Sequence, residues 1–416
     1  MEKKNLWLFL IGRFISFIGS GVQMIALPLY ILDKTGSGTL MGVFSILTLV
    51  PMVLAAPISG IVGDRKNRRN VMIVMDFGRG ALICGMGILA MSGYFNIYTL
   101  FVLQVFISLM DSLFNSSSQA LLPDLISKEK LIEANSMKGG LDAAAFILGP
   151  ALGGVIYGIW GIKTVFYING ISFILSGILS IFIVYKHVVT VKEKVNAKVF
   201  VKENLEVIKF IGLKKGLLQL FTFAMISNFL LAPMFDIVMP YALKKGIGFT
   251  SQHYGYIMGF FTGGILLGNL AISLKFKNIG LKKLMKSGLI IETIITLILA
   301  SLLFPGPVTL LGGASYTLFI AIALCAITMG FFNAFVNTPI STNLQNLVPK
   351  DMRSRFFAIL GMFSQGAIPL GSLIFGILLD LMKYYNLMAG VNIVAAIAAA
   401  IFVIFACDEA YEVKEN

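Results

Sequence analysis

Residues 40–91 read LMGVFSILTLVPMVLAAPISGIVGDRKNRRNVMIVMDFGRGALICGMGILAM. Two apolar runs, 40–63 and 71–91, are separated by a short cationic segment. Each run is long enough to cross a bilayer, because a transmembrane helix needs roughly 20 mostly apolar residues. Backbone polar groups in lipid must be hydrogen-bonded internally, which a helix achieves within one segment. The stretch therefore predicts a helical hairpin that crosses a membrane twice.

The same alternation of apolar runs and polar breaks extends over all 416 residues. The chain is 57% hydrophobic and 13% charged, with a mean hydropathy of +0.89, whereas a soluble domain is roughly 25% charged. This composition argues against a soluble enzyme, a disordered chain and a nucleic-acid binder. We predict an all-α membrane protein with twelve transmembrane helices, at residues 6–32, 40–63, 71–91, 98–121, 136–158, 165–185, 217–243, 252–274, 287–304, 312–337, 356–382 and 387–407.

Lysine and arginine concentrate on one side of this arrangement. The two termini and the loops after even-numbered spans hold 25 of the 33 cationic residues, and the loops on the other side hold 5. Cytoplasmic loops of membrane proteins carry an excess of Lys and Arg. We therefore expect a multi-pass protein of the cell membrane with both termini in the cytoplasm.

The longest loop, 186–216, is cationic and divides the chain into two six-helix halves, 1–185 and 217–416. We interpret 186–216 as a cytoplasmic central loop and the end of the chain as a short cytoplasmic tail. The loop contains VKENLEVIKFI at 201–211, which could form an amphipathic helix on the inner leaflet. A solvated tether between the halves is the alternative interpretation.

An internal repeat supports the division into two halves. Gln119 and Pro123 follow the fourth span, and Gln345 and Pro349 follow the tenth at an offset of 226 residues. Related six-helix halves with a cavity between them are an arrangement typical of secondary transporters. The repeat therefore favours two pseudo-symmetric halves and transport by alternating access.

The loop after the second span reads Gly60-Ile-Val-Gly-Asp64-Arg65-Lys66-Asn67-Arg68-Arg69. It resembles the G-x-x-x-D-R-x-G-R-R signature of the major facilitator superfamily, with Asn67 where Gly is usual. Asn tolerates the left-handed backbone better than most residues, so we expect the turn to be preserved. An ordinary cationic loop is the alternative. The resemblance implies a conformational latch between the two halves, formed by Gly60, Asp64, Arg65, Arg68 and Arg69.

The fifth span reads Ala145-Phe-Ile-Leu-Gly149-Pro150-Ala-Leu-Gly153-Gly154. It is similar to the G-x-x-x-G-P-x-x-G-G motif of the superfamily's drug antiporters, with Ala145 in place of the first Gly. Proline removes a helix hydrogen bond and bends a span, and small residues let helices approach closely. The resemblance favours export, whereas a plain helix-packing seam is the alternative for Gly149, Pro150, Gly153 and Gly154.

Further stretches look like the branch of this superfamily that contains macrolide-efflux proteins and the enterobactin exporter. Arg13 stands where that branch often has an uncharged polar residue. The resemblance implies the major facilitator fold with a cavity lined by spans 1, 4, 7 and 10. The stretches that carry it are 12–19, 26–30, 64–79, 122–124 and 133–136.

Ionisable residues inside spans are costly, so each is a candidate functional group. Removal from water disfavours the charged form of a carboxylate, which could then bind a proton on one side and release it on the other. We favour Asp111 and Asp236, the deepest of the group, as coupling residues; a purely structural ion pair is the alternative. The candidates for proton coupling or substrate binding are Asp111, Asp236, Glu292, Asp142, Arg13 and Asn115.

Helical spacing adds two expectations about these polar residues. Spacings of three and four place Ser108, Asp111, Ser112 and Asn115 on one face of the fourth span, which we expect to face the cavity. Asp76 and Arg79, three apart near the inner surface, favour a structural ion pair.

The resulting hypothesis is a secondary efflux transporter that exports a hydrophobic or amphipathic compound, such as a macrolide, by proton antiport. We expect a functional monomer in a lipid bilayer without cofactor, metal or nucleic-acid partner. A siderophore exporter, or a lysophospholipid or metabolite transporter of the same fold, is the alternative, and a channel suits the two-half arrangement less well. The chain lacks the GxxxxGK[ST] loop of ATP-driven pumps, the HExxH pattern of zinc enzymes and the Gly-x-Gly-Asp pattern of intramembrane aspartyl proteases.

Asp64→Asn should abolish transport while membrane insertion stays normal, because the resemblance assigns Asp64 to the latch rather than to the core of a span. The measurement is transport by cells in which the variant and the wild type are present in the membrane in equal amounts. Normal transport by the variant would remove the latch assignment.

Overall fold

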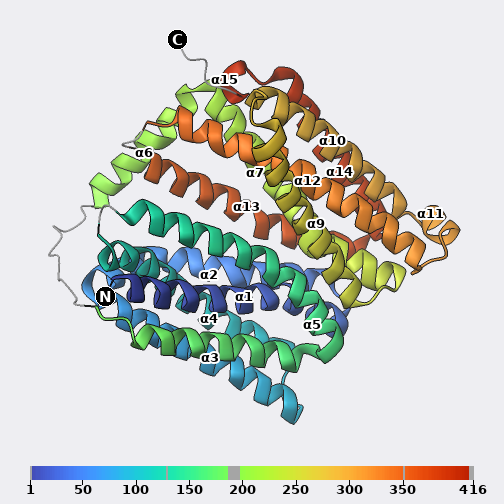
Figure 1. The fold of residues 1–416 in the computed structure, drawn as a ribbon. Coiled ribbons are helices and arrows are strands. Elements are labelled where there is room, and N and C mark those ends of the chain that lie inside the picture. The colour runs from blue at the N-terminus through green and yellow to red at the C-terminus, as the bar shows by residue number, and fades with distance from the viewer. Residues whose placement is uncertain (1, 128–129, 186–196, 350–351, 412–416) are drawn as a thin grey trace. The chain divides into compact units, whose positions relative to one another are not determined.

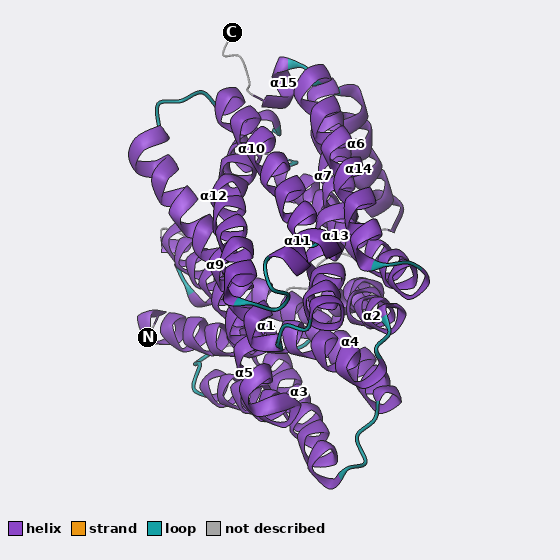
Figure 2. Cartoon of the chain, turned by 90° about the vertical axis from the view of Figure 1, so that its right-hand side faces the viewer, coloured by secondary structure: helices purple, strands orange, loops and turns teal. Residues whose placement is uncertain are grey.

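The computed structural model describes residues 2–127, 130–185, 197–349 and 352–411. Within these ranges the chain forms helices joined by loops and turns, and no strand occurs (Figures 1 and 2). The elements are α1 (Glu2–Thr35), α2 (Gly38–Arg65), α3 (Arg68–Ser92), α4 (Ile97–Leu125), α5 (Leu131–Ile181), α6 (Ala197–Leu213), α7 (Lys215–Pro233), η2 (Met234–Val238), α8 (Met239–Tyr241), η3 (Ala242–Ile247), α9 (Ser251–Ala271), η4 (Ile272–Phe276), α10 (Leu281–Leu302), α11 (Pro305–Leu310), α12 (Tyr316–Leu347), α13 (Arg353–Leu381), α14 (Tyr384–Phe405) and α15 (Asp408–Tyr411).

Eleven helical segments of the described chain are long and apolar enough to cross a membrane. Helix α5 accounts for the difference from the twelve predicted spans, because it covers both 136–158 and 165–185. Its 51 residues would extend about 77 Å, more than twice the roughly 30 Å of a bilayer core. The backbone breaks at Gly161, where φ is 73° and ψ is −176°. We therefore assign two crossings to α5, one on each side of Gly161.

The seventh predicted span is a single helical segment whose hydrogen-bonding pattern changes along its length. After Pro233, which ends α7, the chain forms the π-helical turns η2 and η3 with α8 between them. Proline cannot donate a backbone hydrogen bond, and single π-turns often occur where a regular helix is interrupted. Asp236 lies in η2.

The described helices group into two compact units. The first contains residues 1–36, 44–191 and 251–255, which include α1, α3, α4, α5 and most of α2. The second contains residues 37–43, 192–250 and 256–416, which include α6, α7, α10, α12, α13, α14 and most of α9. Each unit has its own buried apolar core.

In the second unit, the predicted amphipathic segment of the central loop forms helix α6. Val207 is fully buried and Ile211 is 4% exposed, and both belong to the apolar core of this unit. Leu205, Ile208 and Leu213 on the same helix are exposed. The segment is therefore a packed amphipathic helix rather than a solvated tether, and its position on the inner leaflet stays a prediction.

The last described residues of the chain are also held in the core of the second unit. Tyr411 on α15 is fully buried, and its hydroxyl donates to the carbonyl oxygens of Phe402 and Val403. Asn343 Nδ2 of α12 donates to the carbonyl oxygens of Glu409 and Ala410 at 3.0 and 2.9 Å. The predicted short tail is thus tied to α12 and α14 as far as Tyr411.

Helix α2 begins in the second unit with a cap supplied by α13. The Asp380 carboxylate accepts hydrogen bonds from Ser37 Oγ at 2.7 Å, Gly38 N at 2.8 Å and Thr39 N at 2.9 Å. A carboxylate at this position satisfies backbone donors that have no partner within the helix. A Cβ on Gly376 would lie 2.2 Å from the carbonyl oxygen of Gly38, so the two backbones are in direct contact.

Gly161→Ala should destabilise the protein by about 1–3 kcal/mol, because this backbone conformation is essentially restricted to glycine. Gly140→Ala is the matched control on α5, since a Cβ there would meet nothing within 4 Å. We expect the control to be neutral or slightly stabilising, as Ala favours the helix over Gly. Thermal unfolding of the purified variants in detergent measures both. Equal unfolding temperatures for Gly161→Ala and the wild type would contradict the assigned break.

Candidate functional site

An ion-pair triad in the first unit joins α3 and α4. Arg79 Nη2 lies 2.5 Å from Asp76 Oδ1 on the same helix, and Arg79 Nη1 lies 2.5 Å from Asp111 Oδ1 on α4. Ser176 of α5 donates its hydroxyl to Asp76 Oδ2 at 2.8 Å. The triad therefore contains the expected Asp76–Arg79 pair and adds Asp111, the favoured coupling residue.

Two aromatic rings enclose the guanidinium of this triad. Arg79 Cζ lies 4.2 Å from the ring centroids of both Phe114 on α4 and Phe173 on α5. A cation held over an aromatic face is stabilised by the ring quadrupole, more strongly when it is removed from water. Arg79 is 3% exposed, so its position is fixed by three helices at once.

The triad combines two carboxylates with one guanidinium. With both carboxylates ionised it carries a net charge of −1, which is costly in a membrane span. The Asp76 side chain is fully buried, whereas the Asp111 side chain is 30% exposed. Asp111 is therefore the member of the triad that can exchange a proton with water.

A second charged cluster in the first unit has the opposite balance. Arg13 of α1 binds Asp142 of α5 through two bonds, Nε to Oδ1 at 2.7 Å and Nη2 to Oδ2 at 3.1 Å. Lys138 Nζ reaches Asp142 Oδ2 at 2.9 Å, and Arg13 Nη1 donates to Ser118 Oγ on α4. Two cations share one carboxylate, so Arg13 and Asp142 are ion-paired rather than isolated.

The polar side chains expected on one face of the fourth span contact two different helices, α2 and α3. Ser108 is 1% exposed and donates to the carbonyl oxygen of Leu47 on α2 at 3.2 Å; Ser112 is 4% exposed and accepts from Ser59 of α2 at 3.0 Å. The prediction that these serines face a cavity is wrong. Helical spacing places side chains on a common face, but the neighbouring helix decides what that face touches. Within the described chain, Asn115 forms no hydrogen bond.

In the second unit, the intramembrane carboxylates differ from those of the first. Glu292 on α10 accepts a hydrogen bond from Asn333 Nδ2 of α12 at 2.9 Å. Asp236 and Glu292 have no lysine or arginine within 4.0 Å among the residues that the structure describes. A carboxylate without a counter-charge is stable in such a place mainly in its protonated form.

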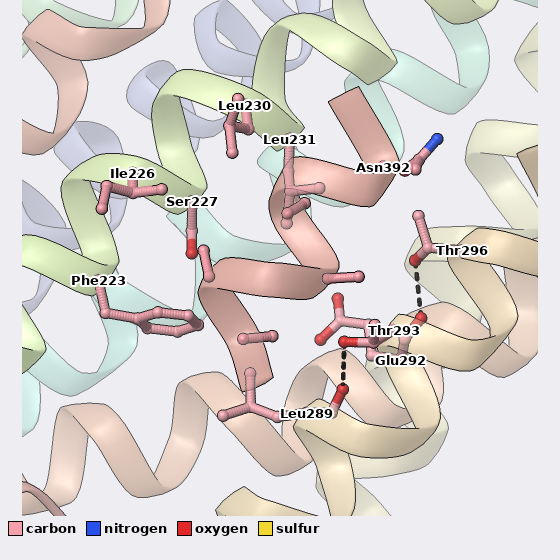
Figure 3. A pocket seen from close by; sticks show the side chains of 14 residues that line it. Phe223, Ile226, Ser227, Leu230, Leu231, Leu289, Glu292, Thr293, Thr296 and Asn392 are labelled. Atoms are coloured by element: carbon pink, nitrogen blue, oxygen red, sulfur yellow. Dashed lines mark hydrogen bonds between the residues drawn. The ribbon is translucent and has the colours of Figure 1, made fainter. Parts of the chain in front are cut away.

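Glu292 also lines a pocket between α7, α10 and α14 (Figure 3). Its carboxylate points from α10 into the space that Phe223, Leu231 and Leu289 border. All of these helices belong to the second unit. The pocket is thus mostly apolar with one carboxylate inside it.

The cationic loop between α2 and α3 makes its described contacts within the first unit. Arg68 Nη1 pairs with Asp124 Oδ2 at 2.5 Å, and Arg69 Nη1 donates to the carbonyl oxygen of Ile183 at 2.9 Å. Burial, followed by the hydrogen bond to Asp124, raises the pKa of Tyr185 to about 12, so this hydroxyl stays a donor at neutral pH. The surroundings of Gly60 and the side chains of Asp64 and Arg65 lie outside what the structure describes.

Asn67 preserves the turn in this loop by a different route from the expected one. Its φ of −61° and ψ of 109° are extended, and its Oδ1 accepts from Asn70 N at 3.1 Å as the N-cap of α3. The expectation of a left-handed conformation is therefore wrong. Asn is favoured at an N-cap because its side chain satisfies a free backbone donor of the first turn.

The glycine motif of α5 packs against α1. A Cβ on Gly149 would lie 2.7 Å from the Cα of Gly21, and one on Gly153 would lie 2.6 Å from the carbonyl oxygen of Val22. Such backbone contact is possible only with glycine on the contact face. Gly154 meets Gly255 of α9 in the same way, whereas Pro150 lies within α5 at a point where the helix continues.

Several residues of these clusters escaped the sequence analysis. Ser176, Phe114 and Phe173 surround the Arg79 triad, and Asn333 binds Glu292. Phe114 follows Asp111 by three residues, a spacing that places both on one helical face and could have indicated it. The others belong to different helices, and nothing in the local sequence links them to their partners.

Comparison with known proteins places the fold in a family. The sequence profile of the Major Facilitator Superfamily matches residues 9–235 and 217–416. Macrolide efflux protein A of Streptococcus pyogenes is 22% identical over 404 residues, which cover 95% of this chain and 96% of that protein. The Staphyloferrin A transporter of Staphylococcus aureus is 23% identical over 378 residues, 89% of each chain. A crystal structure of a mutant of nucleoside transporter NupG has the same fold, with a TM-score of 0.70, 15% identity and coverage of 96% and 98%.

Arg79→Gln should destabilise the protein by about 3–5 kcal/mol, because it leaves two carboxylates without their shared counter-charge. Asp111→Asn should change stability by less than about 1 kcal/mol, since the Asp76–Arg79 pair remains. Adding Asp76→Asn and Asp111→Asn to Arg79→Gln should recover most of the loss. Unfolding temperatures and the monodisperse fraction in detergent measure all three. An Arg79→Gln protein as stable as the wild type would contradict a charge-balancing role.

Proposed function

The chain belongs to the major facilitator superfamily of secondary transporters, and on that premise we propose that it exports hydrophobic or amphipathic compounds in exchange for protons. The observation that carries the proposal is the charge balance of the spans. Asp111 shares Arg79 with a second carboxylate, and Asp236 has no described cationic partner. Groups of this kind bind and release protons at modest cost, which a proton-driven exporter requires.

Asp111 supports coupling through its link to Arg79. When Asp111 binds a proton, the triad becomes neutral and Arg79 remains paired with Asp76 alone. The contact between Arg79 of α3 and Asp111 of α4 is then no longer an ion pair, so protonation changes how the two helices interact. An alternating-access cycle needs such a link, because a ligand shifts a conformational equilibrium only through different interactions with the two states.

Two observations support a hydrophobic or amphipathic substrate such as a macrolide. The similarity to macrolide efflux protein A extends over 95% of the chain. The sequence of the glycine motif of α5, 145–154, is similar to that of drug antiporters. Both favour export over import.

A siderophore exporter is the second candidate. The chain is similar over 89% of its length to the Staphyloferrin A transporter. The cluster of Arg13, Lys138 and Asp142 holds two cations and one carboxylate, an excess of positive charge that could receive an anionic group. This balance would suit a compound rich in carboxylates better than a macrolide.

The proposal also includes an arrangement in the membrane. The halves 1–185 and 217–416, joined by 186–216, would rock against each other as a functional monomer in the cell membrane. Both termini would lie in the cytoplasm, as the distribution of Lys and Arg predicts. Gly60, Asp64, Arg65, Arg68 and Arg69 would act as the latch of this movement.

Expression of the chain in pump-deficient cells should lower their accumulation of a labelled macrolide, and a protonophore should restore it. Asp111→Asn should abolish this export, because the triad then cannot bind and release a proton. Asp408→Asn is the matched control, since Asp408 lies on α15, outside the spans, where it pairs with Lys282 of α10. The measurement is accumulated label at equal amounts of protein in the membrane.

Proton coupling, the substrate class and the role of Asp111 can each be contradicted by a different outcome. Export that a protonophore does not affect would contradict proton coupling. Unchanged accumulation of the macrolide, together with lowered accumulation of a labelled siderophore, would replace the first substrate class by the second. Full export by Asp111→Asn would remove Asp111 from the coupling mechanism.

A further inference from the structure

The pocket between α7, α10 and α14 has an unusual set of polar groups for its size (Figure 3). Most of its lining is apolar, including Phe223, Ile226 and several alanines of α14. Glu292 is the one titratable side chain among the residues that line it. A charge without a partner in such surroundings would be strongly destabilising.

A chain of two amides approaches Glu292 from α12. Asn337, which is exposed, donates its Nδ2 to Asn333 Oδ1 at 2.8 Å, and Asn333 donates its Nδ2 to Glu292 Oε1 at 2.9 Å. Both amides are thereby oriented with their donors toward the carboxyl group. Glu292 Oε2 receives no hydrogen bond from the described residues. One oxygen is therefore occupied from α12, and the other is available to the pocket.

Three of the other four polar residues of the pocket, Asn392, Thr293 and Thr296, also offer acceptors, and the fourth is Ser227. Asn392 of α14 is 2% exposed; its Nδ2 donates to the carbonyl oxygen of Met388 at 2.8 Å. Its Oδ1 is buried and has no donor among the described residues. Thr293 and Thr296 use their hydroxyl hydrogens on backbone carbonyl oxygens of α10, at 2.7 Å each. A buried acceptor without a donor is destabilising, so the pocket favours a ligand that brings donors.

The space in the pocket limits what that ligand can be. The cavity offers about 40 Å³ to the centres of water-sized molecules. One water needs roughly 10–15 Å³ by a comparable measure, so a few waters fit and a drug-sized compound does not. A proton on Glu292 Oε2, hydrogen-bonded to pocket water, supplies the missing donors and removes the charge.

The charged groups near this part of α10 are occupied elsewhere. Lys282 pairs with Asp408 of α15, and Lys286 Nζ lies 5.1 Å from the ring centroid of Tyr411. The facing residues of α7, α12 and α14 that line the pocket or bind Glu292 are uncharged. No described group therefore neutralises Glu292 other than a proton.

We infer that Glu292 is a proton-binding site of the second unit, with water in the α7–α10–α14 pocket and Asn392 Oδ1 as partners of the bound proton. The site is built from different residues than the Arg79 triad. Its role in transport rests on the proposed proton exchange, whereas proton binding itself does not. The two can therefore be tested separately.

Infrared difference spectroscopy of the purified protein in lipid nanodiscs tests the binding. Between acidic and alkaline buffer, the wild type should show the carbonyl band of a protonated carboxyl group that titrates and shifts in D₂O. Glu292→Gln should lose the component of this band that belongs to Glu292, while Asp111→Asn and Asp236→Asn should keep that component. Size-exclusion profiles and thermal unfolding establish that each variant is folded. An acid-minus-alkaline spectrum of Glu292→Gln that matches the wild-type spectrum in this region would overturn the proposal.

Asn392→Leu provides a second test. If Glu292 had a purely structural role, this variant would leave the infrared spectrum unchanged. Leu has a similar size but no acceptor, so the frequency of the Glu292 carbonyl band should change as its hydrogen bonding changes. An identical frequency in this variant would overturn the assignment of Asn392 and pocket water.

These spectra do not depend on transport. Intact Glu292 spectra in a protein without protonophore-sensitive export would contradict the proposed function but not the site. Protonophore-sensitive export together with an unchanged spectrum in Glu292→Gln would contradict the site but not the function.

Discussion

The hydrocarbon core of a membrane offers no water to hydrogen-bond the backbone or to solvate a charge. Every described span is accordingly helical, and even the irregular turns η2, η3 and η4 keep their hydrogen bonds within the segment. Because lipid is as apolar as leucine, helices gain little by hiding apolar surface from it and depend on close packing. The contacts of Gly21 with Gly149 and of Gly38 with Gly376 show the result, with backbones that touch directly.

The same constraint explains the charged residues. In the first unit, Arg79 forms ion pairs with Asp76 and Asp111, and two aromatic rings cover its guanidinium. Arg13 and Lys138 both form ion pairs with Asp142. In the second unit, Asp236 and Glu292 have no described cation near them. The buried carboxylates of the first unit are thus stabilised by ion pairs, whereas those of the second unit are suited to stabilisation by a bound proton. A protein that exchanges protons for another solute can use both kinds of group.

The sequence predicted the spans well because each depends on a local run of apolar residues. It placed 136–158 and 165–185 as two spans, and the break of α5 at Gly161 supports two crossings. It offered an amphipathic helix as one of two interpretations of the central loop, where α6 is found. It was wrong about Asn67 and about Ser108 and Ser112, because a cap and a buried hydroxyl depend on which atoms lie nearby. Hydrophobic periodicity carries no such information.

The amino-acid sequence was enough to predict that the chain crosses a membrane repeatedly, where most spans begin and end, and which ionisable residues lie inside them. Those properties follow from composition over about twenty residues at a time. The packing of the helices was needed to show that Asp111 shares Arg79 with Asp76, that Asp142 binds both Arg13 and Lys138, and that Glu292 contacts Asn333 beside a pocket. These partners come from helices separated by up to 129 residues, and their meeting depends on how whole helices pack.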